Sequence, residues 1–264
     1  MFNSLTHENR YDNLRFLCLF IGYPRSGHSV IGALLDAHEN IAITHEFNIL
    51  SKFKDFHTKE ELFESIIENA KQNAETGRIS YQYSYKMPDL SQGSVKVPIV
   101  LGDKMGSKTT LLLYDDYTLL AQLESFCSLP IKLIHVVRNP FDIITTKAGY
   151  YNGTRAPITL PNLEKAIIQI EKEAIINQDL LRKLSERILT IKHEDLILKF
   201  EETVHKLFNH LELEASEEFV QNARKYVYMQ PKPSRYKYDW PKTHIHQVEK
   251  SIIQDISFMN NYTY

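Results

Sequence analysis

Residues 22–29, G-Y-P-R-S-G-H-S, lie between two apolar stretches and combine the residue types of an anion-binding loop. Gly27 allows a ligand to approach the backbone, Arg25 supplies a permanent charge with a forked set of donors, and Ser26 and Ser29 add hydroxyls. A helix N-terminus presents unpaired N–H groups and a partial positive charge, so a tight turn that leads into a helix suits a phosphate. The segment therefore predicts a phosphoryl site, with a purely structural turn as the alternative.

This loop differs from the common nucleotide-binding sequences. The ATP and GTP loop, G-x-x-x-x-G-K-[ST], needs a Lys-Ser/Thr pair for the terminal phosphates and magnesium, and this pair is missing here. The dinucleotide pattern G-x-G-x-x-G is missing as well. A kinase or NTPase is therefore disfavoured, also because the sequence has no clear acidic magnesium motif.

The elements around the loop indicate an α/β fold. Residues 16–21 form an unbroken apolar run typical of a strand buried on both faces, and Val30, Ile31, Leu34 and Leu35 follow at helical spacing. Further strands are expected at residues 97–101, 131–137 and 188–191, and long helices at residues 58–75, 110–126, 163–184 and 194–213. This alternation predicts a single domain over the whole chain, with a central, mainly parallel sheet flanked by helices. Ligands in such folds bind beyond the carboxyl ends of the strands.

Composition narrows the classes of partner. The 264 residues carry 31 Lys and Arg against 33 Asp and Glu, which favours neither nucleic acid nor an anionic membrane. No segment approaches the ~20 apolar residues of a membrane span, and the first residues lack a secretory signal, so we expect a cytoplasmic protein. Cys18 and Cys127 form no disulfide framework or zinc pattern; we expect two reduced, buried thiols and no metal. The sequence leaves a homodimer open.

A second motif gives the loop a specific meaning. Residues 138–146 read R-N-P-F-D-I-I-T-T and follow an expected strand. Together with P-R-S-G-H-S at residues 24–29, this segment resembles the sulfotransferase family, whose members use 3'-phosphoadenosine 5'-phosphosulfate (PAPS). The family carries a P-[KR]-S-G-T-[TS] loop for the 5'-phosphosulfate and an R-[DN]-P-x-D-x-x-x-S segment for the 3'-phosphate. The resemblance implies a P-loop-like sulfotransferase fold, with Arg138 and Thr146 at the 3'-phosphate and Thr146 in the serine position.

Other segments are similar to those of tyrosylprotein and carbohydrate sulfotransferases. Residues 34–47 resemble the helix and loop that carry the catalytic base, which would be Glu46, and L-G-D-K-M implies a catalytic Lys104. Residues 191–196 resemble a Y-E-D-L segment near the adenine, and residues 233–240 a basic loop that closes over the nucleotide. The cofactor-binding residues expected from all these segments are Arg25, Ser26, Gly27, His28, Ser29, Arg138, Thr146, His193, Arg235, Tyr236 and Lys237.

The implied reaction makes separate demands on the site. Sulfuryl transfer needs in-line positioning and stabilisation of the charge that builds on the leaving and equatorial oxygens, for which Arg25 and Lys104 have the right charge. The acceptor also needs a base. If Glu46 is partly buried, its pKa should rise toward the range that suits general-base catalysis. His45 is the alternative base, and only one of these two neighbours is expected to face the acceptor.

Several assignments stay open on the sequence alone. Arg138 is expected to pair with a bound anion or with Asp142. Asp142 equally suits a role at the N-terminus of the following helix. The aromatic side chains of Tyr236 and Trp240 suit stacking or core packing. His28 departs from the family pattern by placing an imidazole where threonine is usual, which offers a ring N–H whose strength depends on pH. His193 equally suits a packed strand-end histidine, and Lys104 an exposed surface lysine.

The acceptor is expected to be an intracellular small molecule with a hydroxyl, amine or guanidine group. Residues 47–56, 83–88 and 149–155 are rich in aromatic and basic groups and are the expected acceptor loops. A nucleotide-binding module or inactive relative is the non-enzymatic alternative, which His28 supports.

Overall fold

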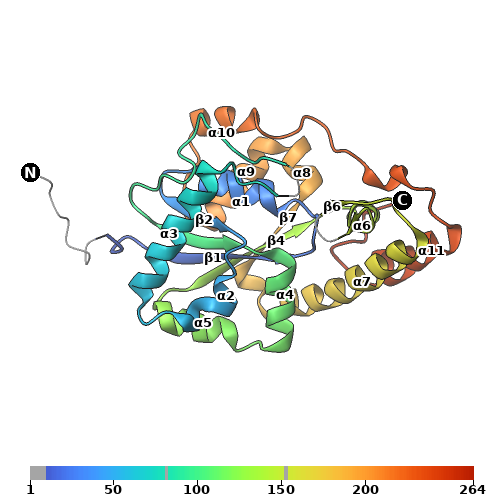
Figure 1. The fold of residues 1–264 in the computed structure, drawn as a ribbon, viewed down its shortest axis with the longest axis horizontal. Coiled ribbons are helices and arrows are strands. Elements are labelled where there is room, and N and C mark those ends of the chain that lie inside the picture. The colour runs from blue at the N-terminus through green and yellow to red at the C-terminus, as the bar shows by residue number, and fades with distance from the viewer. Residues whose placement is uncertain (1–9, 81–82, 152–153) are drawn as a thin grey trace, which may run out of the picture.

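A five-stranded parallel sheet forms the centre of the computed structural model, which describes residues 10–80, 83–151 and 154–264 (Figure 1). Within these residues the strand order is β2-β3-β1-β4-β7, and every neighbouring pair is parallel. The strands are β1 (Phe16–Gly22), β2 (Ile41–His45), β3 (Val100–Lys104), β4 (Ile131–Val137) and β7 (Ile188–Lys192). The predicted α/β class, with a parallel sheet flanked by helices, is confirmed.

Helices cover both faces of the sheet because its strands alternate apolar side chains between them. In β1, Leu17 and Leu19 belong to one buried cluster, whereas Cys18 and Phe20 belong to the other. Figure 1 shows the two helical layers. The Leu17 face packs against α2 (Ile49–Lys52), α3 (Lys59–Glu75), α4 (Gly106–Asp115) and α5 (Leu119–Cys127). The Phe20 face packs against α1 (His28–Asp36), α8 (His193–Leu198), α9 (Phe200–His210) and α10 (Glu217–Arg224). Cys18 and Cys127 are both buried and free.

A third apolar cluster lies beside the carboxyl ends of β1 and β4. It joins α6 (Pro140–Ala148), α7 (Leu160–Lys183), α11 (Lys242–Val248) and a π-helical turn, η5 (Glu249–Gln254). The remaining elements are three short 3-10 helices, η2 (Phe53–Asp55), η3 (Ser185–Arg187) and η4 (Ser234–Lys237), and a hairpin of β5 (Tyr150–Tyr151) and β6 (Thr154–Arg155). In the described residues, no helix is both long and apolar enough to cross a membrane.

Helix starts follow local capping chemistry. The Thr58 side chain accepts a hydrogen bond from the N–H of Glu61, and the Glu61 carboxylate accepts one from the N–H of Thr58. Helix α3 therefore begins with a full capping box. Asn139 accepts from the N–H of Phe141 at 3.0 Å and precedes a proline at the start of α6. These caps place two helix starts at positions compatible with the sequence expectations.

Four of the expectations for helices and strands were wrong. Residues 41–45 form strand β2, although they were expected in a helix and loop, because the short run I-A-I-T-H alternates buried β-branched residues. The strand expected at residues 97–101 begins at Val100, since Pro98 cannot donate to a ladder. The helix expected at residues 110–126 is divided into α4 and α5 by Asp116, which has an extended conformation. Lys199, with φ −126, similarly divides residues 194–213 into α8 and α9.

Candidate active site

The loop between β1 and α1 has the geometry of a tight turn that opens a helix. Arg25 has φ 66 and Gly27 has φ 107, so both residues have a positive φ. Glycine adopts such a conformation without a steric cost, which favours glycine at position 27. Among the described residues, no side chain caps α1 at Gly27. The N–H groups of its first turn therefore remain available to an anion. The Arg25 guanidinium lies 3.9 Å from the centre of the Tyr150 ring, so the β5–β6 hairpin adjoins this loop.

Two expected donors of the loop point into the protein. His28 is buried, with Nε2 3.0 Å from the carbonyl oxygen of Ile21 and Nδ1 3.1 Å from Ser26 Oγ. The buried Ser26 hydroxyl donates to the carbonyl of Tyr23 at 3.0 Å. Both side chains thus brace the loop from within, which differs from the expected donation toward a ligand. Burial lowers the pKa of His28 to about 4, so its ring is neutral at physiological pH.

Gly27 is in close contact with His193, the first residue of α8. A Cβ atom on Gly27 would overlap Nδ1 of the His193 ring, so the glycine lets the loop pack against the end of β7. Among the described residues, this buried Nδ1 has no hydrogen-bond partner. Burial, with the nearby Arg138 charge, lowers the pKa of His193 to about 3. His193 therefore lies at the loop as a neutral ring, and its role as a ligand stays a prediction.

Lys104 and Glu46 form an ion pair at the carboxyl ends of β3 and β2. Nζ of Lys104 donates to Oε1 of Glu46 at 2.7 Å. The lysine side chain is 3% exposed, whereas the glutamate side chain is 48% exposed. Gly32 of α1 allows this arrangement, because a Cβ there would lie 2.9 Å from Lys104 Cβ. The predicted base and lysine are thus adjacent to each other and to α1, the helix that follows the loop after β1.

The protonation of this pair differs from the expectation for Glu46. Burial acts to raise the pKa of Glu46, but the charge and hydrogen bond of Lys104 outweigh it, and the net pKa is lowered. The expected rise toward neutral pH is therefore wrong for the ligand-free site. Burial also lowers the pKa of Lys104, partly offset by Glu46. Glu46 is a carboxylate at neutral pH, as a general base must be.

His45 lies deeper than Glu46 and faces a different environment. It is the last residue of β2, opposite Lys104 in the register of β3, and its Nδ1 is buried without a partner among the described residues. Burial and the charges of Lys104 and Arg78 lower the pKa of His45 to about 3. Such a ring is a weak base, so the geometry favours Glu46 over His45.

Arg138 joins the second motif to the first loop. Its Nη1 donates to the carbonyl oxygen of Arg25 at 3.3 Å, and its side chain is 14% exposed. Arg138 directly precedes the N-cap of α6, whereas Thr146 lies in the last turn of this helix, and its Oγ1 is buried without a hydrogen-bond partner among the described residues. A guanidinium and an unsatisfied hydroxyl from one segment match the groups expected at a 3'-phosphate.

With this geometry established, comparison with known proteins identifies the family. The sequence matches the family described as Sulfotransferase domain over residues 18–255. The chain belongs to the sulfotransferase family. It is therefore a sulfotransferase enzyme, and the movement of a sulfuryl group is its general activity. No curated protein sequence matches the chain significantly.

Solved structures support the fold of this sulfotransferase. The sulfotransferase domain of the Synechococcus PCC 7002 olefin synthase matches with a TM-score of 0.51 at 16% identity, covering 88% of this chain and 83% of that one. Sulfotransferase STF9 from Mycobacterium avium matches with a TM-score of 0.50 at 10% identity, covering 91% and 76% of the two chains. At such identities the likeness concerns the fold alone.

The late basic segment of the sulfotransferase is anchored to α6. Asp142 accepts from both the N–H and Nη1 of Arg235, each at 2.8 Å, whereas Arg138 lies 4.0 Å from this carboxylate. Asp142 thus pairs chiefly with Arg235 and not with Arg138. Trp240 is buried and donates to Thr145 Oγ1 at 3.0 Å, so its ring packs in the core. The side chains of Tyr236 and Lys237 are exposed.

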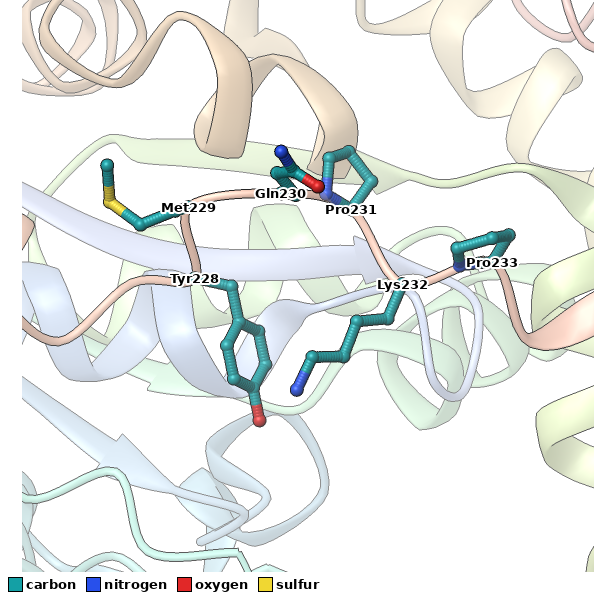
Figure 2. A pocket seen from close by; sticks show the side chains of 6 residues that line it. All are labelled: Tyr228, Met229, Gln230, Pro231, Lys232 and Pro233. Carbon is teal, nitrogen blue, oxygen red and sulfur yellow. The ribbon is translucent and has the colours of Figure 1, made fainter.

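A hollow beside Arg138 was missed by sequence reasoning. Residues 228–233 line a volume of about 480 Å³, and Figure 2 shows the side chains of Tyr228 and Lys232 extending to the same side of the segment. Lys232 Nζ lies 4.0 Å from the centre of the Tyr228 ring. Arg138 Nη2 donates to the carbonyl oxygen of Lys232 at 3.0 Å and to Ser234 Oγ at 3.3 Å. The only sequence signal was the position of this segment directly before the basic loop.

Two of the three expected acceptor loops meet near the loop between β1 and α1. Ser29 lies beside Tyr85, where burial raises the pKa of the tyrosine and the Ser29 side chain acts to lower it, and Arg155 Nη2 donates to the Tyr83 hydroxyl at 2.9 Å. Residues 83–88 and the hairpin β5–β6 are thereby connected, although residues 152–153 of the third expected acceptor loop lie outside the described residues. A contact between Tyr85 and Ser29 across 56 positions has no signal in the sequence pattern.

Proposed function

We propose that this sulfotransferase uses PAPS, with PAP as the product. The N–H groups at the start of α1, with Arg25 and Ser29, would hold the 5'-phosphosulfate, and Arg138 and Thr146 would hold the 3'-phosphate. The observation that carries this proposal is the 3.3 Å contact from Arg138 Nη1 to the Arg25 carbonyl, which links two motifs more than a hundred residues apart. One nucleotide with a phosphate at each end fits such a pair of neighbouring sites.

The adenosine would lie against the segment that follows α10. The hollow lined by residues 228–233 has a volume of about 480 Å³, within the ~300–1,000 Å³ of small-molecule sites. Tyr228 offers a ring face and Lys232 a cation beside it. Arg235, Tyr236 and Lys237 would close over the bound nucleotide, and for Arg235 this closure would require release from its ion pair with Asp142.

In the proposed reaction, Glu46 accepts the proton of the acceptor as the acceptor oxygen or nitrogen attacks the sulfur in line. The bond between sulfur and the phosphate oxygen breaks, and PAP leaves. Lys104, Arg25 and the loop N–H groups stabilise the charge that builds on the transferred and leaving oxygens. The ion pair between Lys104 and Glu46 keeps both groups at the reaction centre.

The acceptor we propose is a small molecule with a hydroxyl, amine or guanidine group. Phe47 and Phe56 have ring centres 6.5 Å apart next to Glu46, and Lys52 Nζ lies 4.7 Å from the Phe47 ring. These rings and this cation support an acceptor with an apolar body. The compartment that we propose for the protein is the cytoplasm.

A thermal-shift comparison tests the cofactor. Stabilisation by PAP, together with none by ATP and magnesium, is expected because binding to the folded state alone raises the melting temperature. Stabilisation by ATP and magnesium but not by PAP would contradict the proposal. A chain that binds PAP but transfers no sulfuryl group to any member of a panel of alcohols, phenols, amines and guanidines would be a binding module instead.

A further inference from the structure

The turn that carries Glu46 is held in an unusual backbone conformation. Glu46 has φ 67 and Asn48 has φ 68, so two non-glycine residues out of three adopt the left-handed region. Such residues cost free energy and persist only where the surroundings hold them. The position of the Glu46 carboxylate therefore depends on whatever stabilises this turn.

Asp103 provides that stabilisation from the neighbouring strand β3. Its Oδ1 accepts from Thr44 Oγ1 at 2.7 Å and from the N–H of Phe47 at 3.1 Å. Its Oδ2 accepts from the N–H groups of Asn48 at 2.6 Å and Ile49 at 3.1 Å. The residue is 1% exposed. Four donors thus converge on one buried carboxylate, which matches its acceptor capacity.

The order of residues in β3 couples this turn to the ion pair. Asp103 directly precedes Lys104, so one strand end holds the backbone that carries Glu46 and also contacts the Glu46 side chain at 2.7 Å. No hydrogen bond between Asp103 and the Glu46 side chain occurs in the described part of the chain. Asp103 therefore affects Glu46 indirectly, through the turn and through its charge beside Lys104, whose pKa it acts to raise.

We propose that Asp103 is a positioning residue for the general base, which it holds by accepting the N–H groups of Phe47, Asn48 and Ile49. This inference rests on the proposed role of Glu46 in proton abstraction. A shift of about 1 Å at a reacting group can cost ~100-fold in rate, so loss of this turn is expected to lower turnover while nucleotide binding at Arg25 and Arg138 persists.

Asp103→Asn is the most direct variant, because an amide keeps the shape but replaces one acceptor oxygen by a donor, which faces at least one N–H group in either orientation of the amide. We expect kcat to fall ~10- to 100-fold, with the KM for PAPS and the affinity for PAP unchanged within about twofold. Asp116→Asn is the matched control. The Asp116 carboxylate also accepts from a backbone N–H and a threonine hydroxyl, both of Thr118, but between α4 and α5. This control should keep wild-type kcat.

A double-mutant cycle separates positioning from general structural damage. If Asp103 acts through Glu46, Asp103→Asn combined with Glu46→Gln should lose no more activity than Glu46→Gln alone. Multiplicative losses would overturn the positioning role and leave the role of Glu46 intact. Normal turnover in Glu46→Gln would instead remove Glu46 from the reaction. This result would overturn both the proposed role of Glu46 as the base and the positioning role of Asp103. Normal kcat in Asp103→Asn would overturn the positioning role alone.

Thr44→Val covers the case in which Asp103→Asn does not fold. It removes one of the four donors and leaves the carboxylate and its three N–H partners in place. We expect a smaller fall in kcat, unchanged affinity for PAP, and no additional loss when it is combined with Glu46→Gln. If Asp103→Asn fails to fold, Asp103→Glu is measured as well, since it keeps the charge but displaces the carboxylate by one methylene from the three N–H groups; a folded Asp103→Glu variant with wild-type kcat would overturn the proposal.

Discussion

Lys104 Nζ lies 2.7 Å from Glu46 Oε1, and this ion pair joins the carboxyl ends of two neighbouring strands, β3 and β2. The pair places a cation and a carboxylate beside α1, the helix that follows the proposed phosphosulfate loop. It also keeps the pKa of Glu46 below its ordinary value, because the lysine outweighs the effect of burial. A lysine that turned toward a bound sulfuryl group would release this constraint and make Glu46 a stronger base.

Glu46→Gln should lower turnover by at least ~10²-fold, since an amide cannot accept the acceptor proton. The affinity for PAP should survive, because the groups proposed to bind the nucleotide lie in the loop before α1, in the first turn of α1, and in the segment that enters and forms α6. Steady-state kinetics and calorimetry measure the two effects. Glu39→Gln is a matched control, as Glu39 pairs with Lys96 on the exposed surface. Near-normal turnover in Glu46→Gln would remove this residue from the mechanism.

Lys104→Met should change both the pH dependence of activity and the magnitude of activity. Without the lysine charge and its hydrogen bond, burial is the largest remaining influence on Glu46, so its pKa rises. Activity is lost as pH falls through the pKa of the base, and the acidic limb of the kcat/KM profile should therefore shift to higher pH. We also expect kcat to fall ~10²- to 10³-fold. Lys108→Met, at an exposed position of α4, is the control. An acidic limb that stays in place would contradict the importance of this ion pair.

Much of the fold could be predicted because the buried strands are unbroken apolar runs. The strand at Ile131–Val137 has the expected bounds, and the helix α3 begins one residue after its predicted start. Strand β2 was missed because five residues following a helix give little periodic signal. Strand β3 was predicted at residues 97–101 instead of Val100–Lys104, because Gly102, Asp103 and Lys104 look like a polar loop. Those three residues are buried by contacts with other segments.

Gly27→Ala should weaken PAP binding and destabilise the fold. A side chain at φ 107 is strained, at a cost of ~1–3 kcal/mol, and its Cβ would also overlap the His193 ring. Thermal unfolding and PAP titration measure the two effects. Gly149→Ala is the control, since its nearest neighbour would be an ordinary 3.4 Å away. Adding His193→Ala should recover only the part of the loss that comes from the overlap. Unchanged stability and affinity in Gly27→Ala would show that the described loop conformation is not the functional one.

His28 should make the stability of the protein depend on pH. Burial lowers its pKa to about 4 in the folded state, against ~6.5 when unfolded. Between these values the unfolded chain binds a proton that the folded chain does not. The free energy of unfolding should therefore fall as pH drops from 6.5 toward 4, by up to about 1.4 kcal/mol per pH unit from this residue. Urea unfolding at several pH values should give a shallower slope for His28→Asn, and equal slopes would contradict the buried, neutral ring.

The sequence placed the site but not its side-chain contacts. The resemblance to tyrosylprotein and carbohydrate sulfotransferases predicted Glu46 and Lys104 in one site, whereas the strand that ends directly before Glu46 was not predicted. The inward direction of the His28 ring, the Asp142–Arg235 pair and the Trp240–Thr145 hydrogen bond depend on which distant segments meet. Periodicity and motif spacing carry no information on such contacts.

The difference in affinity between PAP and adenosine 5'-monophosphate tests the central claim most directly. These ligands differ by the 3'-phosphate alone, so calorimetric titration isolates the contribution of Arg138 and Thr146. The account predicts that PAP binds more tightly by an amount typical of a charge-assisted contact, ~1.5–3 kcal/mol, and that Arg138→Ala removes most of this difference. Equal affinities of the wild-type chain for the two nucleotides would contradict the assignment of PAPS as the cofactor.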